Sequence, residues 1–484
     1  MQDIKFGTDG IRGVWGSDLN VQDCTIIGRA IVEYFGAGCY CVGRDSRDSG
    51  NEILEALYIG MNYGADISKK IDISSKVEIF DLGIVSTPLV SFATNNKNCK
   101  CGIVITASHN PKEYNGIKLF DSNGRKLDSK TEKEFLEVLH SVQKSKNSEF
   151  SNIYTNLNIN HLDLKSEYIS HITRDCPQLD GISVALDCSC GGLGTIAVEA
   201  FESLGANVLA YNTQWDSDKI NAGIGALHPK YLISQMNDIN KSHSTTDTDV
   251  TLGFAFDGDA DRVVVVYDNM VVDGDSVLYN ISKVVDFYDT DTIVATTLSN
   301  SGLENALKTD NKNLVRTAVG DKYIVEYMAQ HNLILGGEQS GHYIVQPYAC
   351  TGDGLVAALN FTKSLLSNTE SQVSNSNETV LQVINSKIPK LNPPQYINLV
   401  PQKSLDKFVS KTILDDDMYK LLSIKYTTIL RNKGRILMRY SGTEPKLRIM
   451  VESTDDKLME YILKDFSAFV DDFSMHNAQC SMHN

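Results

Sequence analysis

The sequence lacks any long apolar run and any excess of basic residues. No stretch of about 18 apolar residues occurs, so we expect no membrane-spanning helix. The start, MQDIKFGTDG, has no charged segment followed by an apolar one, so we also expect no signal peptide. The 484 residues contain 45 Lys and Arg against 61 Asp and Glu, a formal charge of −16. This acidic excess disfavours nucleic acid and anionic membranes as partners, but a small anionic ligand needs only a local basic pocket.

The sequence also lacks the cysteine spacing of a zinc site. Its ten cysteines include three C-x-C pairs, Cys39/Cys41, Cys99/Cys101 and Cys188/Cys190. These pairs are far apart in the sequence and have no His partners at ligand spacing. Because residues i and i+2 share one face of a strand, the pairs are typical of small buried side chains. We therefore expect free structural thiols in a reducing cytoplasm.

Apolar β-rich runs alternate with amphipathic stretches over most of the length. This alternation predicts βαβ units and repeated α/β domains. Polar stretches rich in Asn and Ser interrupt it and read as linkers or surface insertions. They divide the chain near residues 152, 250 and 375, which predicts four domains: 1–152, 153–250, 251–375 and 376–484.

A first candidate site lies in the segment 106–118, TASHNPKEYNGIK. A β-rich run leads to Ser108, and Asn110-Pro111 forces a turn after it. Ser108 is therefore expected to present its hydroxyl beside His109 and near Lys118. The segment has no G-x-S-x-G elbow, so it is not a hydrolase nucleophile of that type. An ordinary serine in an Asn-Pro turn is the alternative.

A second candidate site is the loop 257–262, DGDADR, between two β-rich runs. Asp257, Asp259 and Asp261 stand at alternate positions, where their oxygens can bind one hard cation, Mg²⁺ or Ca²⁺. An EF-hand does not fit, because Arg262 occupies the position of its glycine and a strand follows. A solvated acidic turn is the alternative.

A third candidate is the glycine-rich segment 336–342, GGEQSGH. Its glycines let the backbone approach a ligand closely, while Glu338 and Ser340 offer groups that bind hydroxyls. A plain glycine-rich turn explains this segment equally well.

A fourth candidate, the segment 439–448, has the inventory of a phosphate site. It combines guanidinium groups, hydroxyls and a glycine-freed backbone within ten residues. The residues concerned are Arg439, Ser441, Gly442, Thr443 and Arg448. A surface turn with chance basic residues is the alternative. The four sites together predict phosphoryl transfer on a phosphorylated sugar, with Ser108 carrying the phosphate.

The four segments, in this order, and the opening FGTDGIRG at residues 6–13 resemble the α-D-phosphohexomutase superfamily. The resemblance covers nearly the whole chain. It implies three similar α/β domains with mixed sheets and a smaller α+β C-terminal domain, arranged as a heart around a central cleft. Gln339 in GGEQSGH and Gly442 in RYSGTEP are most similar to bacterial phosphoglucosamine mutases.

The resemblance implies specific roles in the reaction. Ser108 corresponds to a phosphoserine that a sugar bisphosphate primes, and one Mg²⁺ ion binds beside it. The metal ligands implied are the phosphate on Ser108 with Asp257, Asp259 and Asp261. Arg12 and Arg262 correspond to groups that contact the phosphoserine or the reacting phosphate. Lys118 corresponds to the general acid/base, with His109 nearby.

The resemblance also implies how the sugar phosphate is bound. Glu338 and Ser340 correspond to contacts with the sugar hydroxyls. The site for the phosphate that does not react corresponds to Arg439, Ser441, Gly442, Thr443 and Arg448.

The chain departs from the family pattern at three places, one of which is Lys322, where an arginine is usual after Val-Gly-Asp. Ala260 stands where a glycine is common in the metal loop. Because alanine is small, metal binding should survive unless this position needs a positive φ. In the segment 219–229, KINAGIGALHP, residues Ile224, Ala226 and Leu227 replace a Cys-Gly-Ser-Thr pattern usual in phosphoglucosamine mutases.

The activity implied is reversible conversion of glucosamine 6-phosphate to glucosamine 1-phosphate through a bisphosphate. This reaction feeds synthesis of UDP-N-acetylglucosamine and the cell wall, and we expect a cytoplasmic enzyme, with a homodimer left open. Phosphomannomutase/phosphoglucomutase activity is the alternative. A catalytically silent sugar-phosphate sensor and a metal-dependent phosphatase are further rivals.

Overall fold

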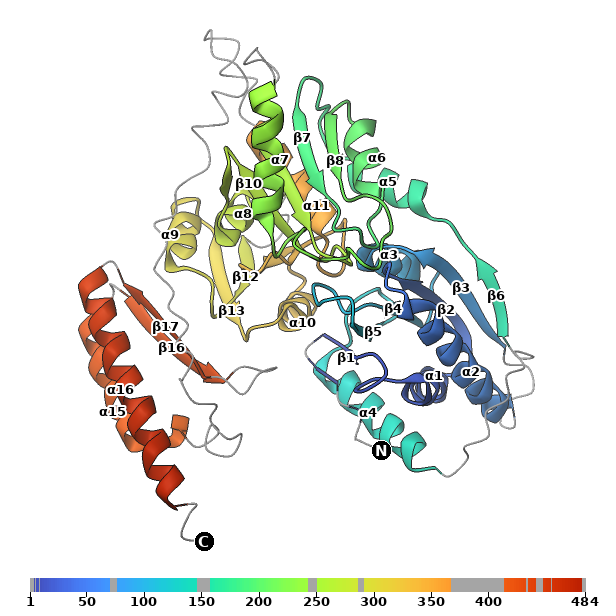
Figure 1. Cartoon of the computed structure of the whole chain (residues 1–484), viewed down its shortest axis with the longest axis horizontal. Helices are drawn as coiled ribbons and strands as arrows, with labels where there is room; N and C mark the ends of the chain where they lie inside the picture. The colour runs from blue at the N-terminus through green and yellow to red at the C-terminus, as the bar shows by residue number, and fades with distance from the viewer. Residues whose placement is uncertain are drawn as a thin grey trace. The chain divides into compact units, whose positions relative to one another are not determined.

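A computed structural model gives the fold (Figure 1). The structure describes residues 4, 6–7, 9–69, 76–145, 157–242, 250–285, 291–366, 413–431, 434–440, 447–453 and 455–480. The chain divides into two compact units, residues 1–299 with 307–389, and residues 300–306 with 390–484. A search of the described helices finds none that is both long enough and apolar enough to cross a membrane. The predicted domain boundaries near 152 and 375 lie outside the described residues.

The first sheet, blue to teal in Figure 1, has six strands in the order β1-β5-β4-β2-β3-β6. The strands are β1 (Ile11–Val14), β2 (Gly38–Arg44), β3 (Val77–Ile84), β4 (Cys101–Ile105), β5 (Tyr114–Phe120) and β6 (Leu157–His161). The four strands from β4 to β6 in the sheet order run parallel, whereas β5 is antiparallel to both its neighbours. The sheet is therefore mixed.

Four helices accompany this sheet. They are α1 (Val21–Phe35), α2 (Ser49–Lys69), α3 (Thr87–Asn96) and α4 (Ser129–Lys144). Helix α1 begins with a capping box, in which Asn20 and Asp23 satisfy each other's backbone N–H groups. Helices α1 and α2 cross closely, since a Cβ atom at Gly28 would lie 2.2 Å from the carbonyl oxygen of Leu57. Only glycine permits that approach.

The second sheet has five strands in the order β11-β10-β9-β7-β8. They are β7 (Ser183–Asp187), β8 (Asn207–Tyr211), β9 (Leu252–Phe256), β10 (Val263–Tyr267) and β11 (Met270–Val271), with helices α5 (Lys165–Thr173), α6 (Ile196–Ser203) and α7 (Pro229–Ser242). Strand β9 pairs in parallel with β7. The segments before and after residue 250 therefore contribute strands to the same sheet. The loop 257–262 connects β9 to β10, so it joins two strands of the second sheet, the sheet that also contains β7 and β8.

The third sheet has four strands in the order β13-β12-β14-β15. Its strands are β12 (Thr292–Thr296), β13 (Asn313–Thr317), β14 (Leu335–Gly337) and β15 (Tyr343–Val345). The neighbouring helices in the chain are α8 (Gly274–Ile281), α9 (Ser301–Thr309), α10 (Asp321–His331) and α11 (Gly354–Leu366). The sheet is mixed, since β15 is antiparallel to β14 and the other pairs are parallel.

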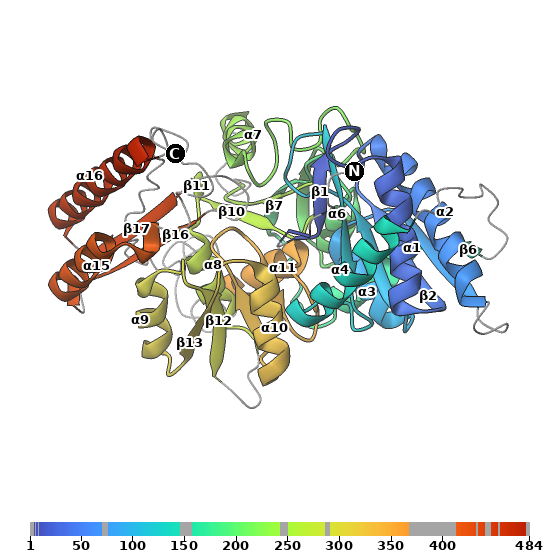
Figure 2. The ribbon, with the colours of Figure 1, turned by 90° about the horizontal axis from the view of Figure 1, so that it is seen from below.

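The smaller unit contains an antiparallel pair of strands, β16 (Gly434–Tyr440) and β17 (Leu447–Ser453). The described part of this unit also contains residues 300–306, the 3₁₀ turn η2 (Ile413–Asp415) and the helices α15 (Asp417–Leu430) and α16 (Asp456–Cys480). Both helices lie on one side of the strands (Figure 2). Its core includes Tyr426, Ile449 and Phe466. The expected fold class, three α/β domains with mixed sheets and a smaller α+β C-terminal domain, is confirmed.

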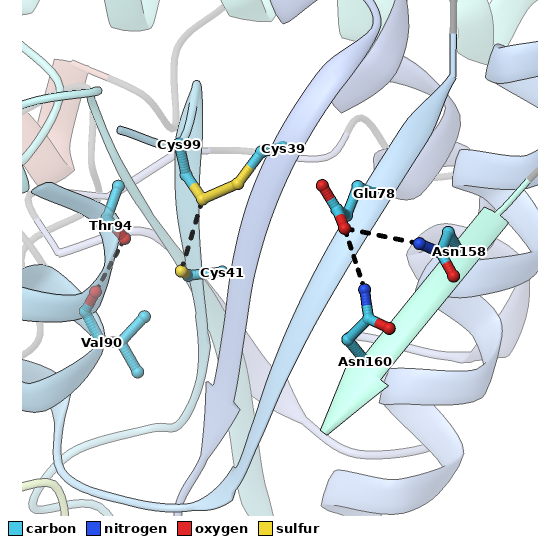
Figure 3. The surroundings of a disulfide bond; sticks show 8 residues. All are labelled: Cys39, Cys41, Glu78, Val90, Thr94, Cys99, Asn158 and Asn160. Carbon is cyan, nitrogen blue, oxygen red and sulfur yellow. Dashed lines mark hydrogen bonds between the residues drawn. A yellow bond between two sulfur atoms is a disulfide. The ribbon is translucent and has the colours of Figure 1, made fainter. Parts of the chain in front are cut away.

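The prediction of free thiols is wrong at one place. Cys39 and Cys99 form a disulfide (Figure 3), and the thiol of Cys41 lies 3.6 Å from the sulfur of Cys99. The pairs Cys39/Cys41 and Cys99/Cys101 are far apart in the sequence, so no contact between them was expected. In the structure β2 and β4 are parallel neighbours, and Tyr40 is aligned with Cys101. This register brings residues 39 and 99 together. Seven cysteines are free within the described residues: Cys24, Cys41, Cys101, Cys176, Cys188, Cys190 and Cys350.

Candidate active site

Ser108 lies just beyond the end of β4, in the connection to β5, and is completely buried. Its φ of 53° is in the left-handed region, which residues other than glycine rarely adopt. The Ser108 hydroxyl donates to Asp257 Oδ2 at 2.8 Å and lies 3.2 Å from His109 Nδ1. The two segments predicted to act together, 106–118 and 257–262, thus meet at this serine.

The loop between β9 and β10 holds three buried carboxylates. One oxygen each from Asp257, Asp259 and Asp261 lies within 4.8 Å of the others. Burial and the neighbouring charges of Asp261 and Asp259 raise the pKa of Asp257 to about 7. Asp259 Oδ1 is buried and has no hydrogen-bond partner in the described part of the chain. Mutually repelling carboxylates with an unpartnered oxygen fit a hard cation such as Mg²⁺.

Lys118, on β5, points its ammonium group at these carboxylates. Its Nζ lies 2.7 Å from Asp259 Oδ2, 2.7 Å from Asp261 Oδ2 and 3.3 Å from Asp9 Oδ2. Burial lowers the pKa of Lys118, but the three carboxylates raise it by more than burial lowers it, so the pKa lies above its ordinary value. Lys118 is therefore protonated in this arrangement.

A second buried lysine extends this network, and sequence reasoning missed it. Lys126 Nζ lies 2.5 Å from Asp9 Oδ1 and 2.6 Å from Asp321 Oδ2. Burial raises the pKa of Asp9, but Arg12, Lys118 and Lys126 together hold it well below its ordinary value. The only signal for Asp9 was its place in the FGTDGIRG segment, and neither Lys126 nor Asp321 lies in any of the predicted motifs.

The two predicted arginines contact different residues of the site. Arg262 Nη1 lies 2.8 Å from His109 Nδ1, and Arg12 forms an ion pair with Asp9. Burial lowers the pKa of His109 to about 3, helped by the charges of Arg262 and Arg12, so the imidazole is neutral. Arg12 Nε is buried and lacks a hydrogen-bond partner among the residues described. An unpartnered guanidinium N–H suits the binding of an anion.

The segment 336–342 is joined to the carboxylate loop through His342. His342 Nδ1 lies 2.8 Å from Glu338 Oε1, and its Nε2 lies 3.2 Å from Asp261 Oδ1. Ser340 Oγ donates to Glu338 Oε1 at 2.7 Å. Burial raises the pKa of Glu338, but His342, Ser340 and Arg262 outweigh burial and lower it to about 2. Glu338 is thus an ionised acceptor.

The predicted phosphate site in the smaller unit is only partly described. Ser441, Gly442 and Thr443 lie outside the described residues. Arg439, near the end of β16, is paired through the backbone register with position 448 of β17, where the sequence has Arg448. The two arginine positions are therefore opposite each other on neighbouring strands.

Family comparisons match four domain models in the order of the chain. They are described as domains I, II and III and the C-terminal domain of phosphoglucomutase/phosphomannomutase. The matched residues are 3–146, 166–270, 273–383 and 406–468, respectively. The match to domain II includes the carboxylate loop 257–262, as the second sheet does.

Similar curated proteins include phosphoglucosamine mutases from several bacteria. That of Campylobacter fetus subsp. fetus (strain 82-40) is 33% identical and covers 96% of this chain and 98% of its own. That of Dictyoglomus turgidum (strain DSM 6724 / Z-1310) is 34% identical with the same coverage. That of Clostridium botulinum (strain Alaska E43 / Type E3) is 35% identical, covering 93% of this chain and 95% of its own.

Similar solved structures show the same fold. A phosphoglucomutase/phosphomannomutase family protein from Burkholderia thailandensis superposes with a TM-score of 0.76 at 22% identity, covering 98% of both chains. An Aspergillus fumigatus N-acetylphosphoglucosamine mutase, in complex with GlcNAc-6P and magnesium, has a TM-score of 0.53 at 14% identity and covers 98% of this chain and 96% of its own. With relatives above 30% identity over nearly the full length, this chain belongs to the phosphoglucomutase/phosphomannomutase family and is a phosphohexomutase, an isomerase that transfers phosphoryl groups.

Proposed function

We propose that the chain interconverts glucosamine 6-phosphate and glucosamine 1-phosphate, with Ser108 carrying the transferred phosphate. The observation that supports this most directly is the hydroxyl of Ser108, which lies 2.8 Å from Asp257 Oδ2 at the edge of three buried carboxylates. The names of the similar bacterial proteins support the choice of amino sugar. We also propose that the reaction takes place in the cytoplasm and supplies synthesis of UDP-N-acetylglucosamine and the cell wall; a homodimer stays a prediction.

In the first half of the reaction, the phosphorylated Ser108 donates its phosphoryl group to the free hydroxyl of the bound sugar phosphate. A bond forms between the sugar oxygen and phosphorus, and the bond between phosphorus and Ser108 Oγ breaks. The sugar hydroxyl loses its proton as its oxygen attacks, and the serine oxygen gains one as it departs; Lys118 is proposed as the general acid/base for these transfers, with His109 nearby. In the second half, Ser108 Oγ forms a bond to the phosphorus of the other phosphate while the bond between that phosphorus and the sugar oxygen breaks. The proton of the serine hydroxyl ends on the sugar oxygen, and the isomer is released.

The binding groups are proposed from their charges. Arg12 and Arg262 contact the reacting phosphate. Ionised Glu338 accepts hydrogen bonds from the sugar hydroxyls, and the hydroxyl of Ser340 can donate to them or accept from them. A Mg²⁺ ion held by Asp257, Asp259, Asp261 and the Ser108 phosphate would neutralise charge on the phosphoryl group. Arg439, Ser441, Gly442, Thr443 and Arg448 are proposed to hold the phosphate that does not react.

A coupled assay with purified enzyme, Mg²⁺ and a catalytic amount of sugar bisphosphate tests the substrate. We expect turnover of glucosamine 1-phosphate to exceed that of glucose and mannose 1-phosphates by at least about tenfold in kcat/KM, because a site that hydrogen-bonds one substituent penalises its absence. Preferred turnover of glucose or mannose 1-phosphate would establish the phosphomannomutase/phosphoglucomutase alternative. Release of inorganic phosphate without isomer would indicate a phosphatase, and neither product together with an unphosphorylated Ser108 would indicate a sensor.

A further inference from the structure

Two side chains outside the four candidate sites hold the backbone of the Ser108 loop, and they come from segments beside different sheets. Arg47 follows β2 of the first sheet, and Asn221 lies in the connection between β8 and α7, beside the second sheet. Both donate to the same pair of carbonyl oxygens. The carbonyl of Ser108 accepts from Arg47 Nη2 at 3.0 Å and from Asn221 Nδ2 at 2.8 Å. The carbonyl of Asn110 accepts from the same two groups at 2.7 and 3.3 Å.

Arg47 makes further contacts that span the whole loop. Its Nη1 donates to the carbonyl oxygens of Pro111 and Tyr114 at 2.5 and 3.0 Å. The guanidinium side chain is fully buried and pairs with the buried Asp45, whose Oδ2 is 3.0 Å from Arg47 Nε. A planar group with five donors suits this set of acceptors, which the single nitrogen of a lysine does not match.

The N–H side of Ser108 is fixed by the same carboxylate. Thr106 Oγ1 donates to Asp45 Oδ2 at 2.6 Å, and the backbone N–H of Ser108 donates to Thr106 Oγ1 at 2.8 Å. Asp45 thus connects the contacts on both sides of the Ser108 peptide. A serine at a φ of 53° persists only when its surroundings determine its conformation.

Asn221 is itself held in place and lies against the carboxylate loop. Ser189 Oγ donates to Asn221 Oδ1 at 3.2 Å, which fixes the amide so that its nitrogen faces the carbonyls. A Cβ atom at Gly258 would lie 2.8 Å from both Asn221 Nδ2 and the Ser108 carbonyl oxygen. The contacts of Asn221 therefore sit at the junction of the Ser108 loop and the loop that carries Asp257 and Asp259.

We propose that Arg47 and Asn221 are positioning residues that hold the Ser108 loop from two sides, so that Ser108 Oγ stays aligned with the carboxylates. This inference rests on the proposed function of Ser108. Neither side chain is among the groups proposed to touch the sugar phosphate, so their loss should lower kcat and leave KM almost unchanged. Misplacement of a reacting group by about 1 Å can cost roughly 100-fold in rate.

The test uses Asn221→Ala in the full-length enzyme, because removal of Arg47 strands the buried charge of Asp45 and endangers folding. The matched control is Asn240→Ala. Asn240, on α7, also exchanges two hydrogen bonds with backbone, to the N–H and carbonyl of Val250, but it does not touch the Ser108 loop. Arg47→Lys, which keeps the charge beside Asp45, serves as the second variant.

Two quantities are measured for each protein: steady-state kcat and KM, and amide hydrogen exchange of the peptide covering residues 106–113. We expect Asn221→Ala and Arg47→Lys to show faster exchange in that peptide and kcat at least tenfold below that of Asn240→Ala, with KM within twofold. Exchange or kcat equal to that of Asn240→Ala would overturn the inference. A wild-type chain without mutase turnover would contradict the proposed function instead, and the exchange of the peptide would then decide whether the loop is held.

Discussion

Ala260 shows a conformational cost at a single residue of the carboxylate loop. Its φ of 57° lies in the left-handed region, and the residue is buried. An alanine at this position is expected to preserve metal binding unless the backbone needs a positive φ, and the φ at Ala260 is positive. An L-residue pays about 1–2 kcal/mol for that conformation, which glycine does not.

We predict that Ala260→Gly is neutral or stabilises the protein by up to about 1 kcal/mol, because the relief of strain exceeds the extra freedom of the unfolded chain. Ala260→Val should lose about 3 kcal/mol, since a β-branched side chain tolerates neither the positive φ nor the tight site. The free energy of unfolding from urea titration measures both. If Ala260→Gly were markedly less stable than wild type, the packing of the alanine methyl group would contribute more free energy than the strained backbone conformation costs.

Asp353 gives a pH dependence that belongs to one side chain. It is buried before α11, where Tyr168 donates to its Oδ2 at 2.6 Å. Burial raises the pKa of Asp353 to about 6, although Tyr168 and the N–H groups of Val356 and Leu355 lower it. An acid whose pKa is raised by folding contributes stability in full below its unfolded pKa near 4, and this is lost as the pH rises through 6.

We therefore predict that the free energy of unfolding of wild type, relative to Asp353→Asn, falls by about 3 kcal/mol between pH 4 and pH 7, at 1.36 kcal/mol per pKa unit. The asparagine keeps an oxygen for the helix N–H groups but does not ionise. Chemical denaturation at several pH values provides the measurement. A difference that stays constant over this range would mean that Asp353 keeps an ordinary pKa.

At the scale of elements, the sequence predicted the loops but not the pairings between strands. Ser108, Asp257 and Lys118 could be selected because their residue types and spacing suit phosphoryl transfer. The contacts of Arg47 and Asn221 could not, because they depend on which strands are neighbours and on where the chain returns. The Cys39–Cys99 disulfide was missed for the same reason.

The disulfide joins β2 to the segment just before β4 and closes a loop with a sequence separation of 60 residues. A cross-link of this kind stabilises a domain by typically 2–4 kcal/mol, mainly by restricting the unfolded chain. We predict that dithiothreitol lowers the melting temperature of wild type by several degrees, and that Cys39→Ser/Cys99→Ser has the lower value with or without reductant. If dithiothreitol left the melting temperature of wild type unchanged, the cross-link would contribute little to stability.

The carboxylates in the loop between β9 and β10 should make the thermal stability of the protein depend on Mg²⁺. Ligands that bind only the folded chain stabilise it by mass action, by about 2.7 kcal/mol at 100 times the Kd. We predict that Mg²⁺ raises the melting temperature of wild type in a concentration-dependent way and that Asp259→Asn abolishes the shift. Equal shifts in the two proteins would place the binding of Mg²⁺ elsewhere.

At the scale of the whole molecule, the charge of −16 is compatible with an anionic substrate. The cations that matter are local: Arg12 and Arg262 lie at the site in the larger unit, and Arg439 lies on β16 of the smaller one. The number and order of domains could be predicted from the chain, because polar linkers recur along it and its motifs stand in the order of the family. The course of the second sheet past residue 250 could not, because a strand pairing and not a change in composition sets that boundary.

The central claim is that Ser108 carries the phosphate that moves between the sugar positions. The most direct measurement is a single-turnover experiment, in which enzyme primed with sugar bisphosphate is mixed with glucosamine 6-phosphate and the mass of the intact chain is followed. We predict that Ser108 loses its phosphoryl group as sugar bisphosphate forms, and that Ser108→Ala carries no phosphate and turns over at least about 10³-fold more slowly. Full turnover by pure Ser108→Ala enzyme would contradict the account.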